Sequence, residues 1–147
     1  MTGWLIDTNV ISEWRKRRPE RRVVDFLSQQ ERIALHTCVI YLAEIRIGAA
    51  GASDQALARS IPQWLDETLR PYFGGRILSL SEDVTVKALR IADECDRKRQ
   101  RISVADVWIA AAAHVHGLTV VTRNLKDFVR TGVPVFNPWT AERFNGA

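Results

Sequence analysis

The sequence predicts an α/β fold with a mainly parallel, helix-covered sheet. The first observation is that short apolar, strand-like segments alternate with longer helix-like segments along the whole chain. The second is a length of 147 residues, which suits one domain with a sizeable core, and no linker or internal repeat divides residues 1–147. The third is a composition of 46% hydrophobic and 26% charged residues, which is ordinary for a globular protein and excludes long disorder.

The expected strands are short aliphatic or β-branched runs, and the expected helices begin at capping residues or a proline. The strands are residues 5–6, 32–36, 76–80, 118–121 and 133–136. The helices are residues 10–17, 19–30, 38–49, 55–69 with an interruption near Pro62, 82–99, 104–116 and 124–129. The expected N-caps are Thr37, Ser81 and Ser103, and the expected terminators are Gly51 and Gly117.

Charge and composition narrow the class of protein. The formal net charge of +4 favours an anionic partner, nucleic acid first, although arginines that merely solvate the surface would give the same value. Cys38 and Cys95 lack CxxC or zinc-site spacing, so we expect buried thiols in a reducing cytosol. The N-terminus has no secretory signal pattern, and the longest apolar run, residues 107–113, is far shorter than the roughly 20 residues of a membrane span. We therefore expect a cytoplasmic protein.

The first expected strand ends on a carboxylate, Asp7, which is followed by Thr8 and Asn9. Ligands and chemistry gather at the carboxyl edge of open α/β sheets, so this position favours a functional acid. Asp also caps turns and helix starts, which is the structural alternative here.

Two further acids stand out by their helical context. Glu44 shares a helix face with Ile40 and Ile47, so we expect it beside the residues that pack on the sheet, where an unpaired carboxylate is costly. A salt bridge to a neighbouring arginine, or a glutamate at the edge of the apolar stripe, is the alternative. Asp106 lies three residues after Ser103, as in a capping box, but the helix it opens is apolar nearly all round. We expect that helix to be buried and Asp106 to point at a covered site.

A fourth candidate lies in the polar turn after the 118–121 strand, where Asn124 and Asp127 have cap and N3 spacing. Several carboxylates from different segments repel when they converge, and a divalent cation removes that cost. All-oxygen ligands favour Mg²⁺, with Mn²⁺ as a substitute, and the three histidines do not form a zinc set. In a basic protein, such a site predicts phosphodiester hydrolysis by a water activated at the metal.

Basic residues flank the candidate acids in two clusters. The RNA-backbone candidates are Arg15, Lys16, Arg17, Arg18, Arg97, Lys98 and Arg99. They suit a phosphate track that gives salt-dependent affinity, and solvated helix ends are the equally weighted alternative. Trp14 can stack on a base, but core packing is the favoured interpretation.

The ordered motifs resemble the PIN-domain ribonucleases, specifically the VapC toxins of bacterial VapBC toxin–antitoxin pairs. The matching segments are LIDTNVISE at 5–13, LAEIRIG at 42–48, SVAD at 103–106 and VTRNLKDF at 121–128. The C-terminal VFNPW at 135–139 is similar to the FitB-type subgroup. The matches follow family order across nearly the whole chain.

The resemblance implies an α/β/α sandwich around a central, mainly parallel sheet of about five strands. It implies Mg²⁺-dependent endonucleolytic cleavage of RNA, such as tRNA or another structured RNA. Asp7, Glu44 and Asp106 would form the acidic cluster, with Asp7 and Asp106 as direct ligands and Glu44 as a second or water-mediated one. Asn9 and Thr122 would orient them. It also implies a homodimer and a small VapB-like antitoxin that fills the groove.

The chain departs from the family pattern at Asn124, where many members carry Asp after Thr-Arg. Either Asn124 or Asp127 therefore fills the fourth corner of the site, or the site works with three acids. Two other functions stay open. One is a nucleic-acid-binding or regulatory module without turnover. The other is an aspartyl-phosphate phosphatase, for which Asn9 stands where a second acid is usual.

Overall fold

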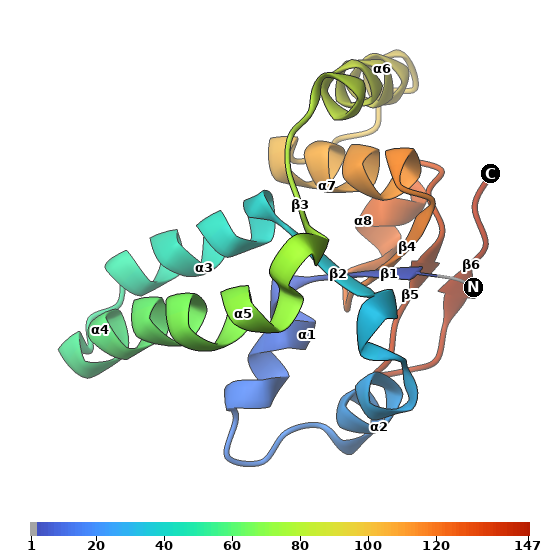
Figure 1. The fold of residues 1–147 in the computed structure, drawn as a ribbon. Coiled ribbons are helices and arrows are strands. Elements are labelled where there is room, and N and C mark those ends of the chain that lie inside the picture. Colours follow the sequence, from blue (N-terminus) through green and yellow to red (C-terminus); the bar gives the residue numbers. More distant parts are fainter. Residues whose placement is uncertain (1–2) are drawn as a thin grey trace.

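A six-stranded sheet forms the centre of the computed structural model, which describes residues 3–147 (Figure 1). Residues 1 and 2 of the expected 1–147 domain lie outside this description. The spatial order is β3-β2-β1-β4-β5-β6, and every pair is parallel except β5 with β6. The strands are β1 (Gly3–Ile6), β2 (Leu35–Cys38), β3 (Ile77–Leu78), β4 (Leu118–Val121), β5 (Val135–Phe136) and β6 (Arg143–Phe144).

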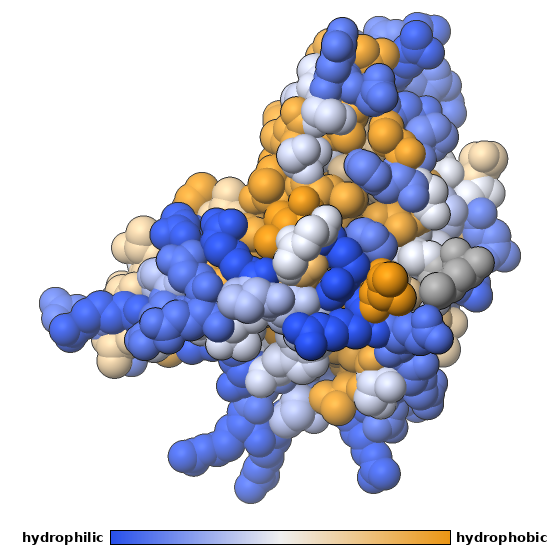
Figure 2. Space-filling view, in the orientation of Figure 1, coloured by the Kyte–Doolittle hydropathy of each residue, from blue (hydrophilic) through white to orange (hydrophobic). Residues whose placement is uncertain are grey.

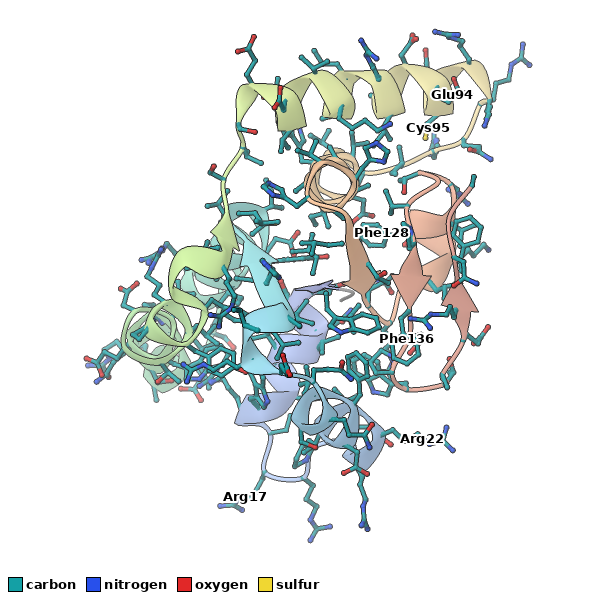
Figure 3. The ribbon with its side chains drawn as sticks, turned by 45° about the vertical axis from the view of Figure 1, so that its right-hand side comes forward. Arg17, Arg22, Glu94, Cys95, Phe128 and Phe136 are labelled. Atoms are coloured by element: carbon teal, nitrogen blue, oxygen red, sulfur yellow. The ribbon has the colours of Figure 1, made fainter. Side chains whose placement is uncertain are left out.

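Helices lie on both faces of this sheet, which confirms the predicted α/β/α arrangement (Figure 1). They are α1 (Thr8–Ile11), α2 (Arg21–Gln29), α3 (Val39–Ala50), α4 (Gln55–Trp64), α5 (Arg70–Phe73), α6 (Glu82–Arg97), α7 (Val104–Val115) and α8 (Leu125–Val129). Alternate strand residues separate two cores. Leu5 and Val120 pack with α6 and α7, whereas Ile6 and Val121 pack with α1, α2 and α3. Figure 3 shows Phe128 and Phe136 directed into the interior.

The strand order reverses between β1 and β4. The chain adds β2 and β3 on one side of β1 and later adds β4 and β5 on the other. Ile6 pairs with Val121, so the residues after them, Asp7 and Thr122, leave the sheet side by side. A crevice forms at such a reversal because the two following connections diverge to opposite faces. The fold therefore places the strand-end acid at the mouth of that crevice.

Most element types match the sequence-based expectation, while several boundaries shift. The 10–17 helix is the short α1 followed by a 3₁₀ turn over Ser12–Arg15, and the 32–36 strand begins as a 3₁₀ turn at Arg32–Ala34. Helix α2 starts at Arg21 rather than at Pro19. The carboxylate of Glu13 accepts the backbone N–H of Glu20 at 2.8 Å, which holds that residue in an extended conformation before the helix.

Helix α4 continues through Pro62 and then widens into a π-helical turn at Leu65–Leu69. The expected interruption is thus a change in helix type three residues after the proline. Helix α3 is capped at Cys38 rather than at Thr37, and Ser81, Ser103 and Gly117 take the expected terminal roles. The short antiparallel β6 goes beyond the expected five strands.

Apolar side chains also reach the surface. Figure 2 shows them gathered over the middle of one face, between α6 and the α3–α5 helices, while hydrophilic side chains project from the lower loops. Ile47 is 73% exposed, Leu89 is 65% exposed and Val104 is 75% exposed. Within residues 3–147, no helix is long and apolar enough to cross a membrane. Cys38 and Cys95 are buried free thiols, as expected.

Candidate active site

Asp7 is the most enclosed acid at the crevice, with 7% of its surface exposed. Its Oδ1 accepts the backbone N–H of Asn9 at 3.3 Å, so Asp7 also caps α1, as the structural alternative predicted. The hydroxyl of Thr122 donates a short hydrogen bond to Oδ2. Burial, with a smaller contribution from the charge of Asp106, raises the pKa of Asp7 to about 6. A cap alone does not need this degree of burial.

Thr122 fixes the orientation of Asp7. It is fully buried at the end of β4, where its hydroxyl donates to Asp7 and accepts the backbone N–H of Asn124 at 3.1 Å. One side chain therefore connects the first strand end to the turn that carries Asn124. This geometry fits the expected role of Thr122, which is to orient the Asp7 carboxylate. Asn9 lies at the same crevice, and its Oδ1 is buried without a hydrogen-bond partner among the described residues.

Glu44 reaches the crevice from α3, where the Thr8 hydroxyl donates to its Oε2 at 3.4 Å. The sequence placed Glu44 among the residues that pack on the sheet, and this was wrong. The packing face consists of Tyr41, Leu42, Ile45 and Ala49, whereas Glu44 is exposed. Helix α3 is apolar on two faces, so periodicity could not distinguish the buried one. Partial desolvation, followed by the charges of Asp7 and Asp106, still raises the pKa of Glu44.

Asp106 lies in the first turn of α7 and is half-buried. Its backbone N–H donates to the Ser103 hydroxyl at 3.1 Å, which confirms the capping interaction. The middle of α7, from Val107 to Ala113, is largely buried between the sheet and α6, as predicted, whereas Val104 and Val115 at its two ends are exposed. Desolvation, and then the charge of Asp127, raises the pKa of the Asp106 carboxyl. Asp106 and Asp127 line a shared cavity of about 500 Å³ with Arg101 and Ser103.

The acids thus form a row that spans two neighbouring cavities. Asp7 and Glu44 line a cleft of about 430 Å³ together with Asn9 and Asn124. Asp127 lies in the other cavity, with Asp106. The two candidates for the fourth site residue, Asn124 and Asp127, therefore lie in different cavities. Across residues 3–147, no three His, Cys, Asp or Glu side chains are close enough to form a complete metal site.

The row nevertheless fits a hydrated divalent cation. Burial chiefly, and neighbouring acids in addition, raise the pKa values of Asp7, Glu44 and Asp106, and no ion pair within residues 3–147 involves these three carboxylates. Within residues 3–147, no direct ion pair therefore offsets the mutual repulsion of these carboxylates. Mg²⁺ binds through one or two carboxylates and retains several waters, so it does not require three converging side chains.

Comparison with known proteins supports the same interpretation of the fold. The family model described as PIN domain matches residues 4–134. The chain belongs to the PIN-domain family. Toxin FitB of Neisseria gonorrhoeae (strain ATCC 700825 / FA 1090) is 36% identical over 92% of this chain and 97% of its own length. VapC ribonuclease Y4jK of Sinorhizobium fredii (strain NBRC 101917 / NGR234) is 31% identical over 92% and 96%. The crystal structure of FitAcB from Neisseria gonorrhoeae has a TM-score of 0.85 at 36% identity, covering 92% of this chain and 98% of that one.

The basic residues of this PIN domain divide into those near the acids and those away from them. Lys16 lines the cleft with Asp7, and Arg15 lies over the Trp64 ring at 5.0 Å. Arg17 points away from the body of the molecule at the tip of its loop (Figure 3). Arg97 and Lys98 are paired with acids of their own helix, α6.

Five residues of the cleft were not predicted as site residues from the sequence, namely Thr8, Ser12, Glu13, Arg123 and Trp139. Glu13 is 2% exposed although it is charged. Arg123 follows Thr122 within a motif already recognised, so its place beside the strand end was the available signal. Trp14, expected in the core, is 36% exposed and packs against the partly buried Tyr72 and the fully buried Phe73.

Proposed function

We propose that this PIN domain is a Mg²⁺-dependent endoribonuclease that acts as the toxin of a type II toxin–antitoxin system. The observation that carries the proposal is Asp7. It is buried where the strand order reverses, is oriented by Thr122, is repelled by two acids from other helices, and forms no ion pair within residues 3–147. A structural cap would not need these neighbours. Net positive charge suits an RNA substrate, for which tRNA or another structured RNA is proposed.

Asp7 and Asp106 would hold the ion, with Glu44 as a second or water-mediated ligand. When bound, Mg²⁺ offsets charge on the phosphodiester and lowers the pKa of water. Thr122 and Asn9 keep the Asp7 oxygens in fixed directions through their hydrogen bonds. Glu44 is exposed and has a raised pKa, so its carboxylate is suited to accept the proton that the attacking water loses as its oxygen bonds to phosphorus and the bridging P–O bond breaks.

The relatives support the biological setting. One is named a toxin, one a VapC ribonuclease, and one solved neighbour is the FitAcB complex. We propose a cytoplasmic protein that forms a homodimer and is neutralised by a small VapB-like antitoxin. The exposed apolar side chains of Leu89 and Val104, which line one groove, suit such protein contacts, since contiguous exposed apolar surface marks interaction sites.

Cleavage of RNA by purified protein tests the proposal. Total tRNA is incubated with wild type, Asp7→Ala, Asp106→Ala and Asp96→Ala in Mg²⁺ and, separately, in EDTA. Asp96 is an exposed acid on α6 and serves as the matched control. We expect cleavage by wild type and Asp96→Ala only in Mg²⁺, and none by the other two variants. Equal cleavage by all four proteins, or by wild type in EDTA, would show that the mechanism is wrong.

A binding module without turnover is the second candidate function. Two observations favour it, the uncharged Asn124 and the lack of three converging ligands within residues 3–147. RNA affinity without Mg²⁺-dependent cleavage in the same assay would select this function over the first.

A further inference from the structure

The cleft that contains Asp7 has a second, basic wall. The same cavity is also lined by Glu13, Lys16, Arg123 and Trp139, which are named here the basic wall. These residues come from the segment after α1 and from the segments after β4 and β5. The two walls therefore converge from distant parts of the sequence on one volume of about 430 Å³.

Glu13 is the fixed point of this wall. Its side chain is 2% exposed, its Oε1 accepts the backbone N–H of Glu20 at 2.8 Å, and its Oε2 is paired with Lys16. Burial alone would raise the pKa of Glu13, but the bonds from Lys16 and Glu20, with the nearby charge of Arg123, lower it. A buried carboxylate held in this way stays ionised and sets where Lys16 lies.

Arg123 is held from the other side. Its guanidinium lies over the Trp139 ring at 4.8 Å, and its backbone carbonyl accepts the Asn137 side-chain amide at 3.4 Å. Arg123 forms no ion pair within residues 3–147. Lys16 is paired with the buried Glu13, and Arg123 lies near enough for its charge to lower the pKa of that carboxyl, so the wall has two cations for one anion and keeps an excess positive charge.

We propose that Lys16 and Arg123 form a phosphate subsite, positioned by Glu13, for a phosphodiester next to the one that is cleaved. This inference rests on the proposed ribonuclease function. The acids of the same cleft repel an RNA backbone, and the positive charges of Lys16 and Arg123 offset that repulsion. The exposed guanidinium of Arg123 offers several parallel N–H donors, a geometry that matches phosphate oxygens.

Binding measured without metal tests the subsite separately from catalysis. A labelled single-stranded oligoribonucleotide is titrated in EDTA at several salt concentrations with wild type, Lys16→Ala, Arg123→Ala and Arg90→Ala. Arg90 is an exposed arginine on α6 and serves as the matched control. We expect about 5–20-fold weaker binding for Lys16→Ala and Arg123→Ala, and a salt slope reduced by about 0.7 for each lost phosphate contact. Arg90→Ala should bind like wild type.

The Glu13→Gln variant tests whether Glu13 positions Lys16. Glutamine still accepts the Glu20 N–H but cannot pair ionically with Lys16. We expect weaker binding, and in cleavage assays a raised KM with kcat within about 3-fold, as for loss of uniform substrate binding. If Glu13 only neutralised the cations, the Glu13→Gln variant would bind RNA more tightly than wild type. That result would overturn the positioning role of Glu13.

Unchanged affinity of Lys16→Ala and Arg123→Ala would overturn the subsite, whether or not wild type cleaves RNA. Wild type that binds RNA but never cleaves it would instead contradict the proposed ribonuclease function, and the binding series would still decide the subsite. If Lys16→Arg binds RNA as tightly as wild type while Lys16→Ala binds more weakly, the difference supports a phosphate contact rather than a folding effect.

Discussion

Asp7 and Asp106 differ sharply in how the fold holds them. Asp7 ends a central strand, is 7% exposed, and has the Thr122 hydroxyl and the Asn9 N–H on its two oxygens. Asp106 is half-buried in the first turn of a helix, beside Ser103 and facing a cavity that it shares with Asp127. Both carboxyls have raised pKa values, chiefly because both are desolvated.

The comparison indicates that the fold fixes the orientation of the Asp7 carboxylate before an ion binds, whereas the half-buried Asp106 carboxylate can adapt its orientation to the ion. Holding an ionised carboxylate at the Asp7 position costs folding free energy, which is acceptable only where a bound cation offsets it. Asp106 keeps contact with solvent, so its ionised form costs less. Removing either acid should therefore impair the site, but with different secondary effects.

The largest expected effect is on catalysis. Asp7→Asn should reduce RNA cleavage by at least about 100-fold at every Mg²⁺ concentration, because the oriented charge is lost. Asp106→Asn should lose about 10–100-fold at low Mg²⁺ and recover in part as Mg²⁺ is raised. Initial rates across a Mg²⁺ titration measure both. Full recovery of Asp7→Asn at high Mg²⁺ would remove the distinction between the two acids.

The next effect is on stability and has a defined pH dependence. The folded-state pKa of Asp7 is raised from its ordinary value of 3.8 to about 6. The folded protein binds this proton more tightly than the unfolded chain, so its stabilising contribution is complete below pH 3.8 and is lost as pH rises through 6. Asp7→Asn does not titrate. In EDTA, it should raise the free energy of unfolding by up to about 3 kcal/mol at pH 8 and by little at pH 4.

Urea unfolding of wild type, Asp7→Asn and Asp106→Asn at both pH values measures this difference. Asp106→Asn is the control, since its carboxyl is more exposed and its stabilisation should be smaller. An equal gain for the two variants would contradict the unequal enclosure that the structure gives them.

Some parts of the site could be predicted from the sequence, and others depend on tertiary packing. The place of Asp7 was predictable because a strand end fixes which edge a residue occupies, and the alternation of elements fixed the parallel sheet. The burial of Glu44 was predicted wrongly, because α3 carries apolar residues on two faces and only tertiary packing selects one. The strand over Arg143–Phe144 is two residues long and has no sequence pattern to reveal it.

The basic wall was hidden for a different reason. Glu13, Arg123 and Trp139 lie far apart in sequence, and their proximity depends on how the connections after β4 and β5 turn. Lys16 was predicted as one of a run of basic residues, and the run itself gave no means of separating it from Arg17, which points into solvent (Figure 3). Local charge patterns predict that a basic surface is present, but they do not predict which of its residues lies in the cleft.

Thr122→Val should shift the pH dependence of cleavage by a smaller amount. Valine keeps the shape but removes the hydroxyl that donates to Asp7, which lowers the pKa of that carboxyl in the wild type. At subsaturating Mg²⁺, where protons compete with the ion for Asp7, the acid limb of the rate profile should therefore move to higher pH, with less change at about pH 8. Rate profiles of Thr122→Val and Thr122→Ser test this. Serine retains the hydroxyl, so an equal shift in both variants would exclude the hydrogen bond as the cause.

The smallest expected effect separates the two ends of the acid row. Asn124 lines the cleft with Asp7, whereas Asp127 lines the cavity with Asp106. Asn124→Asp adds charge beside the most enclosed ligand, so it should tighten Mg²⁺ binding by about 3–10-fold and raise the pKa of Asp7 further in the metal-free protein. Asp127→Asn should weaken Mg²⁺ binding by a similar factor, because it reduces the charge around the adaptable ligand. Calorimetric Mg²⁺ titration of both variants measures these changes. If Asp127→Asn has no effect while Asn124→Asp tightens binding, the ion lies entirely at the Asp7 end and Asp127 serves the helix start of α8 alone.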